Sequence, residues 1–108
     1  MNILAGVLKE ELSNSVRMRR RYEDALRRLP RGSLVGKQIK GHRYYYLAMR
    51  QGARVKFLYK GRLSIEARGK YQQVRRKRLQ YRKLLRQVKH QIAFLQKALH
   101  GNAIRALS

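Results

Sequence analysis

Hydrophobic residues between Val7 and Leu29 recur at alternating spacings of four and three residues. This spacing is typical of the packed stripe, or seam, along one side of a coiled-coil helix. The sequence therefore predicts a first helix over about residues 7–29. It ends before Pro30, because a residue that precedes proline disfavours the α conformation. The predicted seam comprises Leu8, Leu12, Ser15, Arg19, Tyr22, Leu26 and Leu29.

A longer run with the same spacing predicts a second helix over about residues 64–99. Ser64 is suited to cap its N-terminus, and Gly101 is a stop signal. We therefore expect residues 100–108 to form a short C-terminal tail. In the seam of this helix only Arg78 is charged; the seam comprises Ala67, Tyr71, Val74, Arg78, Tyr81, Leu85, Val88, Ile92, Leu95 and Leu99.

The two helices are expected to run antiparallel, because the residues between them return the chain to its starting end. If Leu26 lies near Tyr71, then Arg19 and Arg78 meet in the seam, where two facing arginines are costly. Three solutions are open: the seam separates there, Glu23 or Asp24 reaches across, or a phosphate or partner carboxylate bridges the pair. The first helix also leaves residues 92–99 poorly covered, unless residues 1–7 extend it or a second copy covers them.

Between the helices, residues 34–61 change to the alternation of a β-strand. Two runs, residues 44–50 and 54–60, flank Gln51-Gly52-Ala53, which we expect to form a hairpin loop in which Gly52 takes a positive φ. The resulting register places Arg50 opposite Arg54. One face is then apolar or aromatic (Tyr45, Leu47, Met49, Val55, Phe57, Tyr59), and the other carries Tyr44, Tyr46, Arg50, Arg54, Lys56 and Lys60. Residues 34–40 are suited to a third strand.

These elements predict an α+β fold that is mainly α. Two long antiparallel helices, resembling a coiled coil, flank an inserted β-hairpin or three-stranded meander. We expect one domain over residues 1–108.

The charge of the chain restricts the classes of partner that it can bind. The chain of 108 residues has 28 Lys plus Arg, 5 Asp plus Glu and a formal net charge of +23. Self-repulsion at this charge opposes compaction, so a polyanionic partner is expected. No apolar run reaches the roughly 18 residues of a membrane span, and charge surrounds both helices, unlike the one-sided pattern of a membrane-surface helix. With no Cys and no signal-like N-terminus, we expect a cytoplasmic protein associated with the nucleoid or with ribonucleoprotein.

Few side chains are suited to catalysis. The acids, Glu10, Glu11, Glu23, Asp24 and Glu66, have helix-surface spacing, which is typical of i,i+4 pairing and helix-dipole interaction. Three dispersed histidines without nearby acids or cysteines do not indicate a metal site. We therefore predict no catalytic residue, no metal, no cofactor and no enzymatic activity.

Basic residues interleaved with tyrosines are the strongest functional signal. Arg outnumbers Lys, which favours bidentate contact with phosphate. Tyr44 and Tyr46 are suited to stacking unpaired bases, or equally to ordinary packing in a strand. The predicted nucleic-acid-binding residues are Arg17, Arg20, Arg21, Arg27, Arg28, Tyr44, Tyr46, Arg50, Arg54, Lys56, Arg75, Arg76, Lys77, Arg82, Lys83 and Arg86.

A series of short motifs runs through the centre of the chain: Leu29-Pro30-Arg31-Gly32-Ser33-Leu34, Ile39-Lys40-Gly41, Tyr44-Tyr45-Tyr46-Leu47, Arg50-Gln51-Gly52-Ala53-Arg54-Val55-Lys56 and Tyr59-Lys60-Gly61. In this order they resemble a small domain of unknown function found in bacterial, archaeal and phage proteins, where a coiled coil usually follows. They also resemble the N-terminal hairpin of some insertion-element transposases. The resemblance covers about residues 29–99 and implies a fold and a phage or mobile-element setting, but no catalytic residue.

We therefore predict a non-catalytic protein that binds DNA or RNA through backbone contacts, as an accessory factor in a nucleoprotein complex. The alternative is a phage or mobile-element interaction protein, such as an inhibitor or antitoxin, that acts on a nucleic-acid-processing protein. A protein partner or self-association would then use the end of the second helix.

Overall fold

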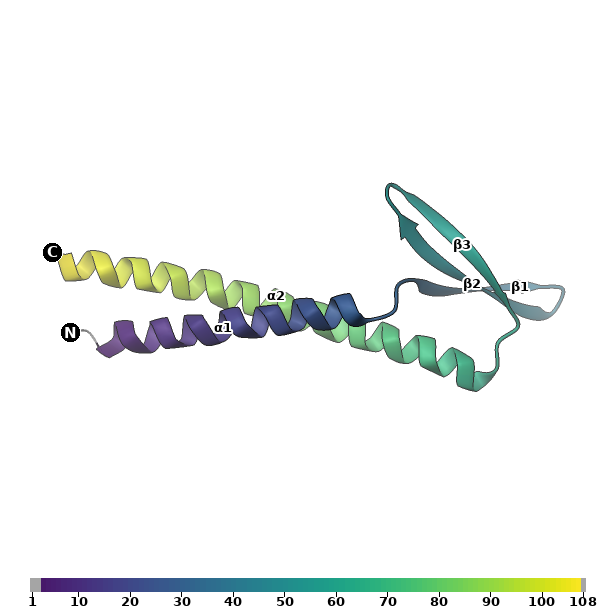
Figure 1. Cartoon of the computed structure of the whole chain (residues 1–108), viewed down its shortest axis with the longest axis horizontal. Helices are drawn as coiled ribbons and strands as arrows, with labels where there is room; N and C mark the ends of the chain where they lie inside the picture. Colours follow the sequence, from purple (N-terminus) through teal and green to yellow (C-terminus); the bar gives the residue numbers. More distant parts are fainter. Residues whose placement is uncertain (1–2, 108) are drawn as a thin grey trace. The chain divides into compact units, whose positions relative to one another are not determined.

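The computed structural model describes residues 3–107, with side chains described over residues 3–101. The elements follow the order α1 (Ile3–Arg28), β1 (Ser33–Ile39), β2 (His42–Gln51), β3 (Arg54–Gly61) and α2 (Ile65–Leu107) (Figure 1). The three strands form one antiparallel sheet in the order β1-β2-β3. The predicted fold class, mainly α with an inserted three-stranded meander, is confirmed.

The chain forms two compact units, of which the first is a helical pair. This helical unit contains α1 and the part of α2 from Gln80 onward. The rings of Tyr22 and Tyr81 lie 6.2 Å apart between centroids, and Gln91 Nε2 donates a hydrogen bond to Ser15 Oγ at 2.9 Å. The earlier residue of α1 thus contacts the later residue of α2, so the two helices are antiparallel, as predicted.

The predicted seam positions are buried or half-buried in both helices. No seam residue of either helix is exposed, and Val88, Ile92 and Leu95 form the buried core of the helical unit. Ser15 is the one fully buried side chain among the described residues, with an exposed fraction of 0%. Its hydroxyl accepts the hydrogen bond from Gln91, so this buried polar group is satisfied.

Both helices are longer than predicted. α1 begins at Ile3 instead of Val7. Because Gln91 lies against Ser15, Ile92 and Leu95 are level with the part of α1 around Leu12 and Leu8, so they are covered by the predicted helix and not by its extension. α2 continues through Gly101 to Leu107, so the predicted stop and the predicted tail from residue 100 are wrong over the described residues. A glycine inside a helix costs only about 1 kcal/mol relative to alanine, and no proline follows to end the helix.

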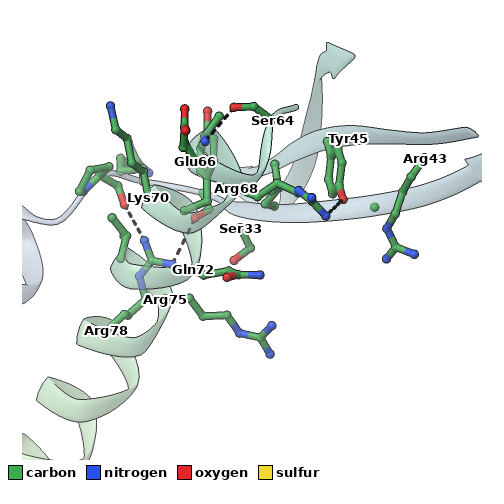
Figure 2. Close-up of a pocket in the computed structure, with 18 residues that line it drawn as sticks. Ser33, Arg43, Tyr45, Ser64, Glu66, Arg68, Lys70, Gln72, Arg75 and Arg78 are labelled. Carbon is green, nitrogen blue, oxygen red and sulfur yellow. Dashed lines mark hydrogen bonds between the residues drawn. The ribbon is translucent and has the colours of Figure 1, made fainter. Parts of the chain in front are cut away.

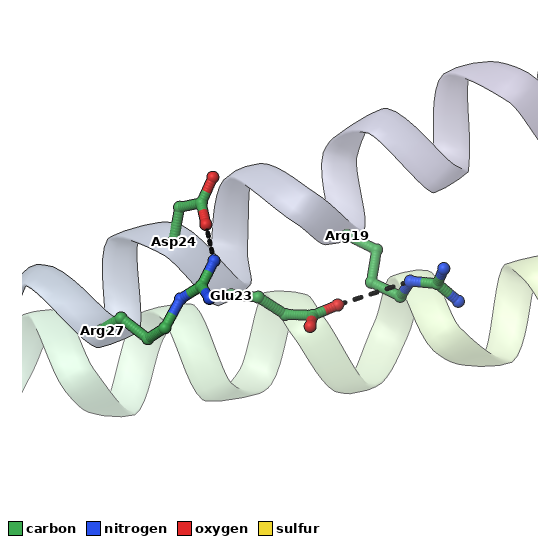
Figure 3. Close-up of polar contacts among 4 residues, drawn as sticks. All are labelled: Arg19, Glu23, Asp24 and Arg27. Carbon is green, nitrogen blue, oxygen red and sulfur yellow. Dashed lines mark hydrogen bonds and ion pairs between the residues drawn. The ribbon is translucent and has the colours of Figure 1, made fainter.

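The predicted meeting of two seam arginines is wrong. Because Tyr22 lies against Tyr81, Arg19 is level with about Leu85 and not with Arg78. Arg19 Nε instead pairs with the Glu23 carboxylate at 3.4 Å along α1 (Figure 3). Arg78 belongs to the second unit, where its guanidinium donates to two backbone carbonyls, Pro30 O at 2.5 Å and Gly32 O at 3.2 Å.

The second unit, residues 29–79, contains the sheet and the first part of α2. Strands β1 and β2 pair from Ser33 opposite Ala48 to Ile39 opposite His42. Lys40 and Gly41 connect them with positive φ angles of 51° and 79°, the pattern of a type I′ turn. The third strand expected over residues 34–40 is therefore present, one residue earlier.

The register of β2 with β3 differs from the prediction by one residue. The loop is Gly52-Ala53 alone, with Gln51 opposite Arg54 and Arg50 opposite Val55. Gly52 has a φ of 63° as predicted, and a glycine at the first position of a two-residue loop is typical of a type II′ turn, whose twist suits a hairpin. Since side chains alternate along a strand, the shift moves every β3 side chain to the opposite face of the sheet.

The sheet consequently has two unlike faces. Its inner face carries Tyr45 and Leu47, which are 7% and 8% exposed, beside half-buried Leu34, Met49 and Leu58. The other face, which we call the open face, comprises Val35, Lys37, Ile39, His42, Tyr44, Tyr46, Ala48, Arg50, Val55, Phe57 and Tyr59. The predicted all-apolar face is thus correct for β2 and wrong for Val55, Phe57 and Tyr59 of β3.

The first turn of α2 is capped as predicted. Ser64 Oγ accepts a hydrogen bond from the Ala67 amide at 3.1 Å, and Ser64 O accepts another from the Arg68 amide at 3.0 Å. Glu66 is the acidic residue of this turn, where a carboxylate interacts favourably with the helix dipole.

Candidate nucleic-acid interface

The open face of the sheet exposes large apolar and aromatic side chains. Val55 is 55% exposed, Phe57 58% and Tyr59 62%, and Val35 and Ile39 of β1 are also exposed. Hydrophobic residues scattered singly on a surface are ordinary, whereas their concentration on one face of one sheet is a feature that interaction sites share.

Aromatic rings follow one another across the open face. The Tyr44 and Tyr59 ring centroids are 6.5 Å apart, and those of Tyr59 and Tyr46 are 5.3 Å apart. His42 continues the row, with its ring centroid 6.5 Å from that of Tyr44. Rings at these separations are in contact, so the face presents a continuous aromatic surface.

Positive charge accompanies these rings without any acid. Lys37 Nζ lies 5.4 Å from the centroid of the Tyr46 ring, within the range of a cation–π contact. Arg50 is exposed at the other end of the face. From residue 33 to residue 61 the sequence has no Asp or Glu, and its cations are Lys37, Lys40, Arg43, Arg50, Arg54, Lys56 and Lys60.

The predicted sheet residues divide between the two faces. Tyr44, Tyr46 and Arg50 share the open face as expected, whereas Arg54 and Lys56 project from the inner face. The placement of Arg54 and Lys56 was wrong because the loop has two residues instead of three. The prediction omitted Lys37, Phe57 and Tyr59. The preference of hairpins for a two-residue loop with glycine first would have brought Phe57 and Tyr59 to this face, whereas Lys37 reaches it through the register of β1 with β2.

The predicted arginines of α1 form a single basic face. At 3.6 residues per turn, their positions fall on the side of the helix away from its seam, and all are exposed: Arg17, Arg20, Arg21, Arg27 and Arg28. Arg17 bonds to Asn14, three residues away along the helix. Arg27 pairs with Asp24 at the same spacing (Figure 3). The exposed Asp24–Arg27 pair contributes little stability.

The predicted cations of α2 are all exposed, and no carboxylate of the described residues lies within ion-pair distance of them. They are divided between the two units. Arg82, Lys83 and Arg86 belong to the helical unit, and Arg75, Arg76 and Lys77 belong to the unit with the sheet.

A groove lies within the second unit, on the inner-face side of the sheet (Figure 2). Its lining comes from residues 30–36, from the start of β2 and from the first turns of α2, and its volume is about 880 Å³. We call it the basic groove, because six cations and a single carboxylate, that of Glu66, line it; the cations are Arg31, Arg43, Arg68, Lys70, Arg75 and Arg78. Of these, the prediction included Arg75 only.

Neither a metal centre nor a membrane span is present among the described residues. No three His, Asp or Glu side chains over this part of the chain gather closely enough to hold a metal ion. Neither helix, over its described length, has an apolar stretch sufficient to cross a bilayer. Comparisons of the chain with family models, curated proteins and solved structures find no match.

Proposed function

We propose that this protein binds DNA or RNA without catalysis, with the open face stacking unpaired bases and the exposed arginines contacting phosphates. The observation that carries the proposal is the aromatic row Tyr44–Tyr59–Tyr46 on an acid-free, lysine- and arginine-bearing face. Every base has a π-face, so a row of rings accepts unpaired bases with little regard to sequence.

The charge distribution supports the same proposal. A net charge of +23 favours a polyanion over any neutral partner, and exposed arginines on α1 and α2 supply contacts to the backbone. A protein partner with an acidic surface would use the cations equally well, and aromatic residues are enriched in protein interfaces too, so the binding experiment decides between the two partners. We further propose, on the resemblance of its central motifs, that the protein serves a nucleoprotein complex of a phage or mobile element.

Binding to a single-stranded oligonucleotide and to a duplex, each measured over a range of salt concentrations, tests the proposal. We expect the logarithm of the affinity to fall steeply and linearly with the logarithm of the salt concentration. The reason is that Lys and Arg side chains that bind phosphates release the counterions condensed on the nucleic acid. We also expect Phe57→Ala to weaken single-strand binding by about 1–3 kcal/mol, the usual contribution of one stacked base.

Phe94→Ala is the matched control, because Phe94 is 69% exposed but lies on α2 in the helical unit. Its affinity for the single strand should equal that of the unmodified protein. Affinity that barely changes with salt, or equal losses for Phe57→Ala and Phe94→Ala, would contradict the proposal. Capture of a discrete protein that survives nuclease treatment would favour the inhibitor or antitoxin alternative.

A further inference from the structure

The basic groove is separate from the surface assigned above to bases. Residues Leu34, Gly36, Arg43 and Tyr45 line it from the inner face of the sheet, and side chains of the two faces project in opposite directions. Pockets of about 300–1,000 Å³ commonly hold small ligands, and the volume of the groove, about 880 Å³, is within that range. It can therefore hold a group larger than a single ion.

Arg68 is the central cation of the groove, and its hydrogen-bonding capacity is incompletely used. Its Nη1 donates to Tyr45 Oη at 3.1 Å, and its guanidinium carbon lies 5.8 Å from the Tyr45 ring centroid (Figure 2). Its Nε is buried and has no acceptor. A buried N–H without an acceptor costs roughly 1–3 kcal/mol, so a shift of the Arg68 side chain that gave this N–H an acceptor in the groove would be favoured.

Further cations of the groove also lack an anionic partner. The Arg43 guanidinium carbon lies 5.9 Å from the Tyr45 ring, so that Arg43 and Arg68 share one aromatic ring. In the view of Figure 2, the guanidinium groups of Arg43 and Arg75 lie on the same side of the Arg68–Tyr45 pair. No described carboxylate is within ion-pair distance of Arg43, Arg68 or Arg75.

We propose that the basic groove binds a phosphate group carried by a nucleotide, through Arg43, Arg68 and Arg75. Guanidinium groups form charge-assisted bidentate hydrogen bonds with phosphate oxygens. A terminal phosphate carries a charge of about −1.5 to −2, more than an internal backbone phosphate, and is therefore preferred. The phosphate can come from the 5′ end of a strand or from a free nucleoside monophosphate. The strand source rests on the proposed function; the free source does not.

Competition between defined probes tests this site. The affinity of the full chain is measured for one single-stranded oligonucleotide with a 5′-phosphate, for the same strand with a 5′-hydroxyl, and for adenosine 5′-monophosphate. We expect the phosphorylated strand to bind about tenfold more tightly than the hydroxyl strand, as two added charge-assisted hydrogen bonds would produce. If the monophosphate binds but the phosphorylated strand binds no more tightly than the hydroxyl strand, the groove is assigned to free nucleotides.

Two variants locate the effect. Arg43→Gln/Arg75→Gln should abolish the preference for the 5′-phosphate and the binding of the monophosphate. The control Arg82→Gln/Arg86→Gln removes the same charge from exposed positions in the helical unit and should keep the preference. Gly36→Ala changes no charge, but its Cβ would lie 2.7 Å from Arg43 Nε, so the flexible arginine must move. We expect Gly36→Ala to reduce the preference severalfold.

The outcomes separate the two proposals. If the hydroxyl strand binds but neither the 5′-phosphate nor the monophosphate is favoured, the groove proposal is overturned and the proposed function stands. A preference that persists in Arg43→Gln/Arg75→Gln also overturns the groove. If no strand binds while the monophosphate binds and is lost in Arg43→Gln/Arg75→Gln, the groove proposal stands and the proposed function fails.

Discussion

The two faces of the one sheet are built from similar residue types but have different surroundings. The inner face places Tyr45 and Leu47 of β2 at 7% and 8% exposure, whereas the open face leaves Phe57 and Tyr59 of β3 at 58% and 62%. Both faces combine aromatic and apolar residues with cations. The difference indicates that hydrophobicity on the inner face stabilises the unit, while hydrophobicity on the open face is available for binding.

The segment before β1 also packs closely against the inner face of the sheet. Gly32 has a φ of 102° and approaches the Leu47 side chain so closely that a Cβ there would lie 2.9 Å from Leu47 Cδ1. Arg78 holds the same segment through the Pro30 and Gly32 carbonyls. The comparison therefore predicts that equal changes have unequal effects on stability at the two faces.

The largest expected effect is that of Leu47→Ala. Removing a buried leucine side chain loses its burial and leaves a cavity, which destabilises by about 2–5 kcal/mol. Urea denaturation followed by circular dichroism measures the free energy of unfolding. A loss below about 1 kcal/mol would mean that the inner face is not the core of the unit.

Gly32→Ala should have an intermediate effect. Alanine in this positive-φ conformation is strained, by about 1–3 kcal/mol, and its Cβ would meet Leu47. Thermal unfolding compared with that of Gly41→Ala separates the two causes, because Gly41 also has a positive φ but a Cβ there would meet nothing within 4 Å. Equal losses for the two variants would show that contact with Leu47 is unimportant.

The smallest expected effect on stability is that of Val55→Thr on the open face. Val55 is 55% exposed, and surface substitutions usually change stability by less than about 0.5 kcal/mol. The free energy of unfolding should therefore equal that of the unmodified protein at every protein concentration. Destabilisation that grows as the protein is diluted would indicate instead that a second copy covers the open face.

The regular patterns of the sequence predict the helices well. Four-three spacing identifies seam positions that are buried or half-buried in both helices, because a helix that buries one stripe must repeat it near every 3.5 residues. The ends are predicted less well: Gly101 does not stop α2, since a lone glycine costs little where the following residues favour helix. The sequence also does not predict which residue of α1 lies opposite which residue of α2, because this alignment depends on contacts between the helices such as that of Tyr22 with Tyr81.

The sequence likewise predicts only part of the candidate site. Tyr44, Tyr46 and Arg50 follow from the alternation along one strand, which fixes their common face. Lys37 joins them through the register of β1 with β2. Tyr59 joins them through the register of β2 with β3, which a single residue in the Gly52-Ala53 turn changes. Alternation along β2 places Arg43 on the same face as Tyr45, but Arg68 is distant in sequence, and no local pattern connects it with the Tyr45 ring.

The amino-acid sequence alone thus determines that the chain is strongly basic, mainly helical and interrupted by a meander, because charge and periodicity are local properties. Strand register, the two unlike faces of the sheet and the basic groove arise only in the folded chain. The physical reason is that register and groove depend on contacts between residues distant in sequence, where a shift of one residue exchanges inside for outside.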